Sequence, residues 1–216
     1  MPDGAGSGET MVRMVSQPCR PHAVVARFVV IYGSTRSDRQ GIRAARFLVR
    51  KLEERGHEVD LLDPLGIDMP FLDHMYKEYD EGEAPAWMQD VHERLDAADG
   101  FVVCSAEYNH SVPAPLKNLI DHFQQEYFFK AAGIATYSAG PFAGQRVATH
   151  WRAVLGELGM YTCSIMFGVS KVQDAFEEDG SPVEEAYDRR VKRFLDELEW
   201  LTDALKAKRK KDGAPY

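Results

Sequence analysis

The sequence has few cysteines, and their positions exclude two common kinds of structural support. The 216-residue chain contains only Cys19, Cys104 and Cys163, an odd number with no CxxC spacing. Such a scattered set predicts neither a disulfide framework nor a zinc site. We therefore expect a cytoplasmic protein that folds around a hydrophobic core, with no metal.

Long apolar runs and an excess of positive charge are also missing. No stretch approaches the roughly 20 apolar residues that a membrane span needs, and the N-terminus lacks the apolar segment of a signal peptide. The formal net charge is −8, which would on balance repel nucleic acid. One basic cluster, from Lys206 to Lys211, is interpreted as a solvated helix end. We expect neither membrane nor nucleic acid as a partner.

The residues that are present indicate a single globular domain. Hydrophobic residues make up 44% and charged residues 28% of the chain, close to globular averages. Residues 1–26 mix Gly, Ser and Pro without a helical or strand period and are predicted to form a flexible extension. The domain is expected over residues 27–209, and residues 210–216 form a short tail.

Five short apolar runs alternate with amphipathic segments along the domain. Continuous apolar runs are typical of parallel strands that are covered by helices on both faces. The alternation predicts an α/β fold with a doubly wound, five-stranded parallel sheet in the order 2-1-3-4-5. A long irregular segment from Asp63 to Pro85 is a candidate functional loop. The five predicted strands are RFVVIYG, HEVDLL, DGFVVCS, GIATYSAG and MYTCSIMF, and the main predicted helices span residues 42–52, 86–97, 144–158 and 183–208.

The loop after the first strand has the composition of an anion site. A helix N-terminus presents unpaired backbone N–H groups, and the loop GSTRSDRQG leads into one. An alternative interpretation is an ordinary turn in which Ser37 or Asp38 caps the helix. The hydroxyl and guanidinium groups of this loop belong to Ser34, Thr35, Ser37, Arg36 and Arg39.

Two nucleotide-binding motifs are absent, which narrows the type of ligand. Neither GxGxxG nor GxxxxGK[ST] follows any predicted strand, so a mononucleotide is favoured over a dinucleotide or a kinase substrate. After the third strand, Glu107, Tyr108 and Asn109 present an aromatic ring and polar groups in a Pro-rich setting. These groups suit the edge and face of a planar heterocycle.

Two motifs resemble those of a known family. GSTR after the first strand and EYNHSVPAPLKNLID after the third resemble the flavodoxin-like NADPH-dependent FMN reductase family, which includes azoreductases, quinone reductases and chromate reductases. The resemblance extends over residues 27–208 and includes the small-residue turn SAGPFAGQR. Two positions depart from it: Ala106, where the family commonly has Pro, and Ala139-Gly140, where it has a Gly pair.

The resemblance implies a site for FMN, with each group of residues in a separate role. The phosphate would be held by Ser34, Arg36 and the helix start at Arg39, Gln40, Gly41 and Ile42. The isoalloxazine ring would contact Ala106, Glu107, Tyr108, Asn109 and Ser111, and its other margin would be lined by Ser138, Ala139 and Gly140.

The implied activity is hydride transfer from NADPH or NADH through FMN to a small acceptor. Quinones, azo compounds, metal oxyanions and free flavin are the expected acceptor classes, used in a ping-pong scheme by a homodimer or homotetramer. No general acid or base is obligatory for this chemistry, so no catalytic side chain is assigned. Two alternatives stay open: a flavodoxin-type electron carrier, and a flavin-bearing regulatory subunit.

Several other features are interpreted as structural. His92-Glu93 resembles half of HExxH but has Asp96 where the second ligand would lie. Cys104 lies inside an apolar strand, where a free thiol acts as a small hydrophobe. The dense aromatic group Phe123, Tyr127, Phe128 and Phe129 is compatible with a subunit interface, a pocket wall or plain core.

Overall fold

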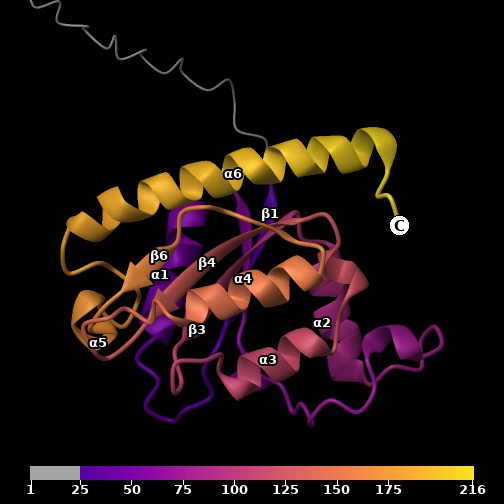
Figure 1. The fold of residues 1–216 in the computed structure, drawn as a ribbon, viewed down its shortest axis with the longest axis horizontal. Helices are drawn as coiled ribbons and strands as arrows, with labels where there is room; N and C mark the ends of the chain where they lie inside the picture. The colour runs from indigo at the N-terminus through magenta and orange to yellow at the C-terminus, as the bar shows by residue number, and fades with distance from the viewer. Residues whose placement is uncertain (1–24) are drawn as a thin grey trace, which may run out of the picture.

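The computed structural model describes residues 25–216, so the predicted extension falls almost entirely outside the described residues. The centre of the fold is a parallel sheet in the order β2-β1-β3-β4-β5. Figure 1 shows strands of this sheet, among them β1, β3 and β4, between the helices. This arrangement confirms the predicted fold class and strand order. The main strands are β1 (Arg27–Tyr32), β2 (Glu58–Leu62), β3 (Gly100–Ala106) and β4 (Ala131–Tyr137).

The fifth predicted strand differs from expectation because it is broken into two. β5 (Tyr161–Thr162) and β6 (Phe167–Val169) both pair with β4. Between them the backbone N–H groups of Ser164 and Ile165 donate to the carboxylate of Glu197, at 2.8 and 2.9 Å. A side chain of the last helix therefore holds two consecutive N–H groups, of which a continuous strand would have turned only one toward β4.

Helices cover both faces of the sheet, as predicted. One core cluster joins the sheet to α1 (Ile42–Glu53) and α6 (Ala186–Asp212), and a second joins it to α2 (Ala86–Asp96), α3 (Ala114–Asp121) and α4 (Val147–Glu157). Figure 1 shows α6 running along the length of the molecule. It begins and ends later than the predicted 183–208. Among the described residues, no helix is long and apolar enough to cross a membrane.

The segment from Asp63 to Pro85 contains two short 3₁₀ helices, η1 (Pro64–Gly66) and η2 (Tyr76–Glu78). It is tied down at several points. The Asn118 side chain of α3 accepts from the Leu72 N–H at 2.9 Å and donates to the Pro70 carbonyl at 2.7 Å. The Tyr76 ring stacks on His92 of α2 with centroids 4.0 Å apart. This loop is thus packed against the fold rather than projecting from it.

A buried polar cluster fixes the start of the domain to the last helix. The Ala26 N–H donates to His57 Nδ1 at 3.3 Å, so the neutral ring carries its proton on Nε2, 3.2 Å from Glu199 Oε1. Arg55 donates to the same carboxylate oxygen at 2.9 Å. Burial raises the pKa of Glu199, but the hydrogen bonds from His57 and Arg55 outweigh this effect and hold the pKa below its ordinary value.

The side chains interpreted as structural lie in structural settings. His92 bonds to the buried Glu126 at 2.8 Å. Cys104 is buried in β3, and burial raises the pKa of its thiol, which makes it a poor nucleophile. Within the aromatic group, Phe123 and Tyr127 are fully buried core residues, whereas Phe128 and Phe129 are half-buried and their rings contact Tyr216 near the end of the chain.

Candidate functional site

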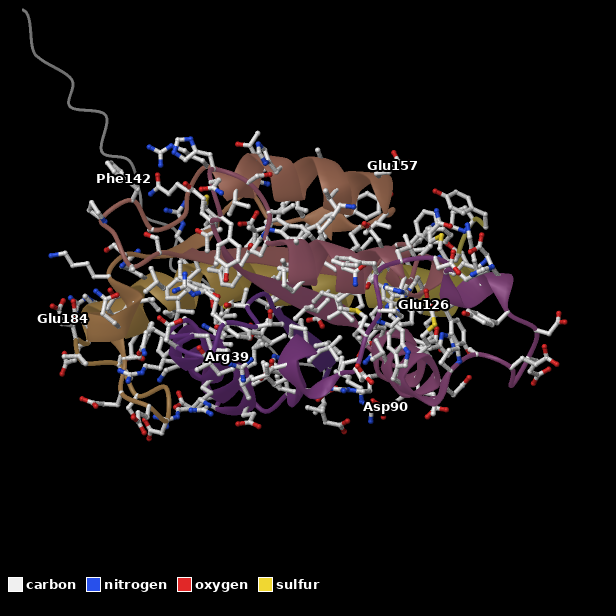
Figure 2. The ribbon with its side chains drawn as sticks, turned by 90° about the horizontal axis from the view of Figure 1, so that it is seen from below. Arg39, Asp90, Glu126, Phe142, Glu157 and Glu184 are labelled. Carbon is white, nitrogen blue, oxygen red and sulfur yellow. The ribbon has the colours of Figure 1, made fainter. Side chains whose placement is uncertain are left out.

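A pocket of about 280 Å³ lies where the loops after β1, β3 and β4 converge. These are the carboxyl ends of neighbouring parallel strands, beside the point where the strand order reverses, which is the usual ligand position in this architecture. Figure 2 shows Arg39 and Phe142 toward this end of the molecule and Glu126 toward the opposite end. The predicted loops therefore meet in space as expected.

The β1 loop delivers the N-terminus of α1 to the pocket. Gly41 occupies the N-cap position, no side chain caps the helix, and no acidic residue lies in its first turn. The alternative interpretation with Ser37 or Asp38 as the cap is therefore wrong. The N–H groups of Arg43 and Ala44 donate to the carbonyls of Gln40 and Gly41, at 3.2 and 3.1 Å. An anion would therefore meet the N–H groups of Gly41 and Ile42 and the positive end of the helix dipole.

Both guanidinium groups predicted for the phosphate already have carboxylate partners. Arg36 pairs with Asp38 at 3.0 Å on the exposed surface. Arg39 makes a bidentate pair with Asp63 at 2.5 and 2.6 Å, donates to the Ser34 carbonyl at 3.2 Å and lies over the Tyr32 ring. Arg39 therefore ties the β1 loop to the β2 loop, while Arg36 is held only by an exposed neighbour.

The β3 loop is a tight turn with an unusual backbone. Tyr108 and Ser111 exchange both backbone hydrogen bonds, at 3.0 and 2.9 Å, and the two residues between them, Asn109 and His110, have φ values of 50° and 64°. Left-handed conformations cost energy for residues with a side chain, although Asn tolerates them best. The Tyr108 hydroxyl lies 2.8 Å from Ser34 Oγ, which links this turn to the loop after β1.

Further polar contacts hold the loop after β4 in place beside the pocket. Glu107 accepts from the Arg146 backbone N–H at 2.9 Å and pairs with its guanidinium at 3.3 Å. Ser138 Oγ donates to the Gly140 carbonyl at 2.9 Å, and that carbonyl also accepts from the Lys171 N–H at 3.0 Å. The β4 loop is thereby fastened to the segment that follows β6.

Most, but not all, of the predicted site residues line this pocket. Four predicted residues do not line it. Ile42 packs against the core, and Asn109 is exposed in its turn. Ser111 Oγ lies 3.1 Å from His150 Nδ1, and the Gly140 carbonyl accepts the hydrogen bonds from Ser138 and Lys171 described above. The predicted residues at the pocket are Ser34, Arg36, Arg39, Gln40, Gly41, Ala106, Glu107, Tyr108, Ser138 and Ala139.

Sequence reasoning missed four pocket residues: Tyr32, Asp38, Tyr137 and Val172. Tyr32 and Tyr137 end the strands β1 and β4, so they were absorbed into the apolar runs that predicted those strands. Their hydroxyls were the overlooked signal, because a hydroxyl at the carboxyl end of a buried strand points to a polar neighbour. Val172 carries no signal in the sequence, because it is an ordinary apolar residue at the start of the short helix α5 (Val172–Ala175).

These residues fit a phosphorylated ligand with a polar chain. The hydroxyls of Tyr32 and Tyr137 are buried and make no hydrogen bond of good geometry, although the two phenols lie close enough to interact with each other. Gly41 approaches the Tyr137 ring so closely that a Cβ at this position would lie 2.1 Å from two ring carbons. An uncapped helix end beside several hydroxyl groups suits the phosphate and polyhydroxyl parts of a mononucleotide.

The fold and the pocket define a flavodoxin-like, mononucleotide-binding α/β protein. The model of the NADPH-dependent FMN reductase family matches residues 26–174, more than half of the chain, and the chain belongs to that family. This confirms the predicted class of enzyme, an oxidoreductase with FMN as cofactor and a reduced nicotinamide as co-substrate.

Individual relatives agree with this assignment. A quinone reductase of Escherichia coli (strain K12) is 34% identical over 131 residues, which are 59% of this chain and 68% of the relative. A probable NADPH:quinone oxidoreductase 1 of Oryza sativa subsp. japonica is 29% identical over 85% of this chain and 95% of its own. The flavoenzyme NAD(P)H:(acceptor) oxidoreductase from Paracoccus denitrificans has the same fold, with a TM-score of 0.66 at 24% identity over 85% of this chain and 98% of its own.

Proposed function

We propose that this protein transfers hydride from NADPH or NADH through FMN to a small acceptor by a ping-pong scheme, and that quinones are its principal acceptors. The observation that carries the proposal is the convergence of the β1, β3 and β4 loops on one pocket in a member of the NADPH-dependent FMN reductase family. Quinones are placed before azo compounds, metal oxyanions and free flavin because quinone is named for relatives at 27–34% identity.

The chain itself contributes binding, orientation and exclusion of water. Bound FMN supplies the ring that accepts and returns hydride. Ser34, Arg36 and the uncapped start of α1 would hold its phosphate. Arg39 is engaged by Asp63, so its role would be to hold the loop in shape.

The strained β3 turn and the braced β4 loop would fix the ring from two sides. Ala106 to Asn109 with Ser111 would lie along one margin, and Ser138 to Gly140 along the other. Backbone N–H groups aimed at the ring would stabilise charge that develops on reduction. No side chain is assigned as a general acid or base.

The acceptor would use the same open face as the nicotinamide, which is the reason for a ping-pong scheme.

Two exposed aromatic side chains lie on loops at this end of the strands: Phe71, in the loop after β2, and Phe142, in the loop after β4, are 86% and 63% exposed. We assign the Asp63–Pro85 loop to the rim of the acceptor pocket. Alternate binding at one face predicts parallel double-reciprocal lines when NADPH and quinone are varied.

Anaerobic mixing of the FMN-loaded protein with NADPH, followed by the visible absorbance of the flavin, tests the proposal. We expect prompt bleaching, then recovery of the absorbance when a quinone is added. FMN binding should weaken in Arg36→Ala and Tyr108→Phe but not in Arg193→Ala, which removes an exposed arginine of α6.

Full FMN occupancy without bleaching by NADPH or NADH would overturn the reductase proposal. A stable neutral semiquinone during titration would then favour a flavodoxin-type carrier. Capture of a protein partner that depends on the flavin redox state would favour a regulatory subunit.

The proposal includes a homodimer or homotetramer in the cytoplasm. Exposed large apolar side chains such as Phe71, Phe142 and Trp200 are the surface features that support self-association. The two cysteines of the described chain, Cys104 and Cys163, are free and buried, as in proteins of a reducing compartment. Analytical ultracentrifugation of the FMN-loaded protein would measure the oligomeric state, and a purely monomeric species would refute it.

A further inference from the structure

Two buried hydroxyl groups at the pocket make no hydrogen bond of good geometry within the protein. Tyr32 ends β1 and Tyr137 ends β4, and these side chains line the pocket. The residues are 0% and 6% exposed, and neither hydroxyl makes a hydrogen bond of good geometry. The two phenols interact only weakly with each other, and that of Tyr32 with Ser34. A buried unsatisfied hydroxyl is costly to a fold, whereas Phe at the same position would avoid that cost. Two such groups at one pocket therefore point to a ligand.

Neighbouring groups pack against both rings. The rings stack on each other with centroids 6.0 Å apart and an interplanar angle of 15°. The Arg39 guanidinium lies over the Tyr32 ring, and the Gly41 backbone lies against the Tyr137 ring. Burial raises the pKa of both phenols, so each stays protonated and acts as a hydrogen-bond donor.

These hydroxyls belong to a wider polar lining. Ser34 Oγ and the Tyr108 hydroxyl, 2.8 Å apart, also lie at the pocket. The ends of β1 and β4 and the loops after β1 and β3 therefore bring phenol and alcohol groups to one place. A ligand with several oxygen acceptors in a row satisfies such a lining, whereas a planar ring contacted through its faces does not.

We propose that Tyr32 and Tyr137 donate hydrogen bonds to oxygen atoms of the ribityl-phosphate chain of FMN and thereby set the affinity of the pocket for its cofactor. The inference rests on the proposed function only in taking FMN as the ligand. It adds two binding residues that lie outside both family motifs. It also explains why two tyrosines, rather than phenylalanines, end these strands.

The test compares Tyr32→Phe, Tyr137→Phe and the double variant with the wild-type chain. Dissociation constants for FMN and riboflavin are measured by flavin fluorescence, and the melting temperature is measured on cofactor-free protein. Tyr127→Phe is the matched control, because the Tyr127 hydroxyl is also buried and unpartnered. Its ring packs on Phe101 at the amino end of β3, and its neighbour Glu126 lies toward the other side of the molecule from Arg39 in Figure 2.

We expect each pocket variant to raise the dissociation constant of FMN by about three- to tenfold, the effect of one lost hydrogen bond. The cofactor-free melting temperature should be unchanged or higher, because an unsatisfied hydroxyl is removed. Tyr127→Phe should leave FMN affinity unchanged. A loss confined to FMN would place the bonds on the phosphate, and an equal loss for riboflavin would place them on the ribityl hydroxyls.

Unchanged FMN affinity in the double variant would overturn the inference while leaving the proposed function intact. Weaker binding that is matched by a fall in cofactor-free stability would assign the hydroxyls to the fold and would also overturn it. A wild-type chain that does not bind FMN would overturn the proposed function as well, so the two failures are distinguishable.

Discussion

Replacement of Gly41 by alanine provides a sharp test of the pocket geometry. The residue has φ −65° and ψ −14°, so an alanine there meets no backbone strain. Its Cβ would lie 2.1 Å from two carbons of the Tyr137 ring, which is held by stacking on Tyr32. Overpacking of this kind costs about 1 to 3 kcal/mol. In a chain of this size that lowers the melting temperature by about 2 to 12 °C.

Thermal unfolding of cofactor-free protein measures the loss, and flavin fluorescence shows whether FMN binding falls with it. Gly156→Ala is the control, because that glycine lies in α4 with no atom near its virtual Cβ. It should stabilise the protein by up to about 1 kcal/mol. In a Tyr137→Ala background the penalty of Gly41→Ala should shrink toward zero. Wild-type stability and FMN affinity in Gly41→Ala would refute the close approach.

Three further predictions concern charged groups. Asp38→Asn frees Arg36 from its exposed partner, so equilibrium titration should show tighter binding of FMN and no change for riboflavin; equal changes for both would contradict this. Arg39→Lys cannot keep the bidentate pair with Asp63, and urea unfolding should show a loss of about 1 to 2 kcal/mol. The depressed folded-state pKa of Glu199 means that its stabilisation is present above about pH 4.5 and is lost as the pH falls through the lower folded value. Glu199→Gln should therefore be less stable by about 1 to 2 kcal/mol at pH 7, and urea titrations should show the difference shrinking in acid; a difference independent of pH would refute this.

The strand order was predictable because buried parallel strands appear as short apolar runs and crossovers have a fixed hand. The break in the fifth strand was not, since it depends on Glu197, which lies far along the chain from the Ser164 and Ile165 N–H groups that it binds. The local sequence of a strand does not show that a distant carboxylate will accept hydrogen bonds from its backbone N–H groups. The last helix, predicted over residues 183–208, spans Ala186–Asp212; its existence was predictable from its pattern, but its ends were not.

The site was predictable at the level of loops more than of contacts. The positions of the loops follow from topology alone, and most residues predicted for them lie at the pocket. The pairing of Arg39 with Asp63 joins two loops whose relative placement exists only in the folded chain. Tyr32 and Tyr137 were missed because an apolar run predicts a buried strand from the hydrophobicity of its residues. The hydroxyl group of a tyrosine at the end of the run does not change that prediction.

The broken fifth strand also affects how copies of the protein can meet. An open sheet edge is a template on which another chain can add a strand, a common route to aggregation. Here one edge consists of two fragments, Tyr161–Thr162 and Phe167–Val169, and the donors between them are held by Glu197. The opposite edge strand carries the acidic side chains Glu58 and Asp60. Neither border offers a long apolar row of free backbone groups, so the sheet is protected against edge-to-edge growth even when the protein is concentrated.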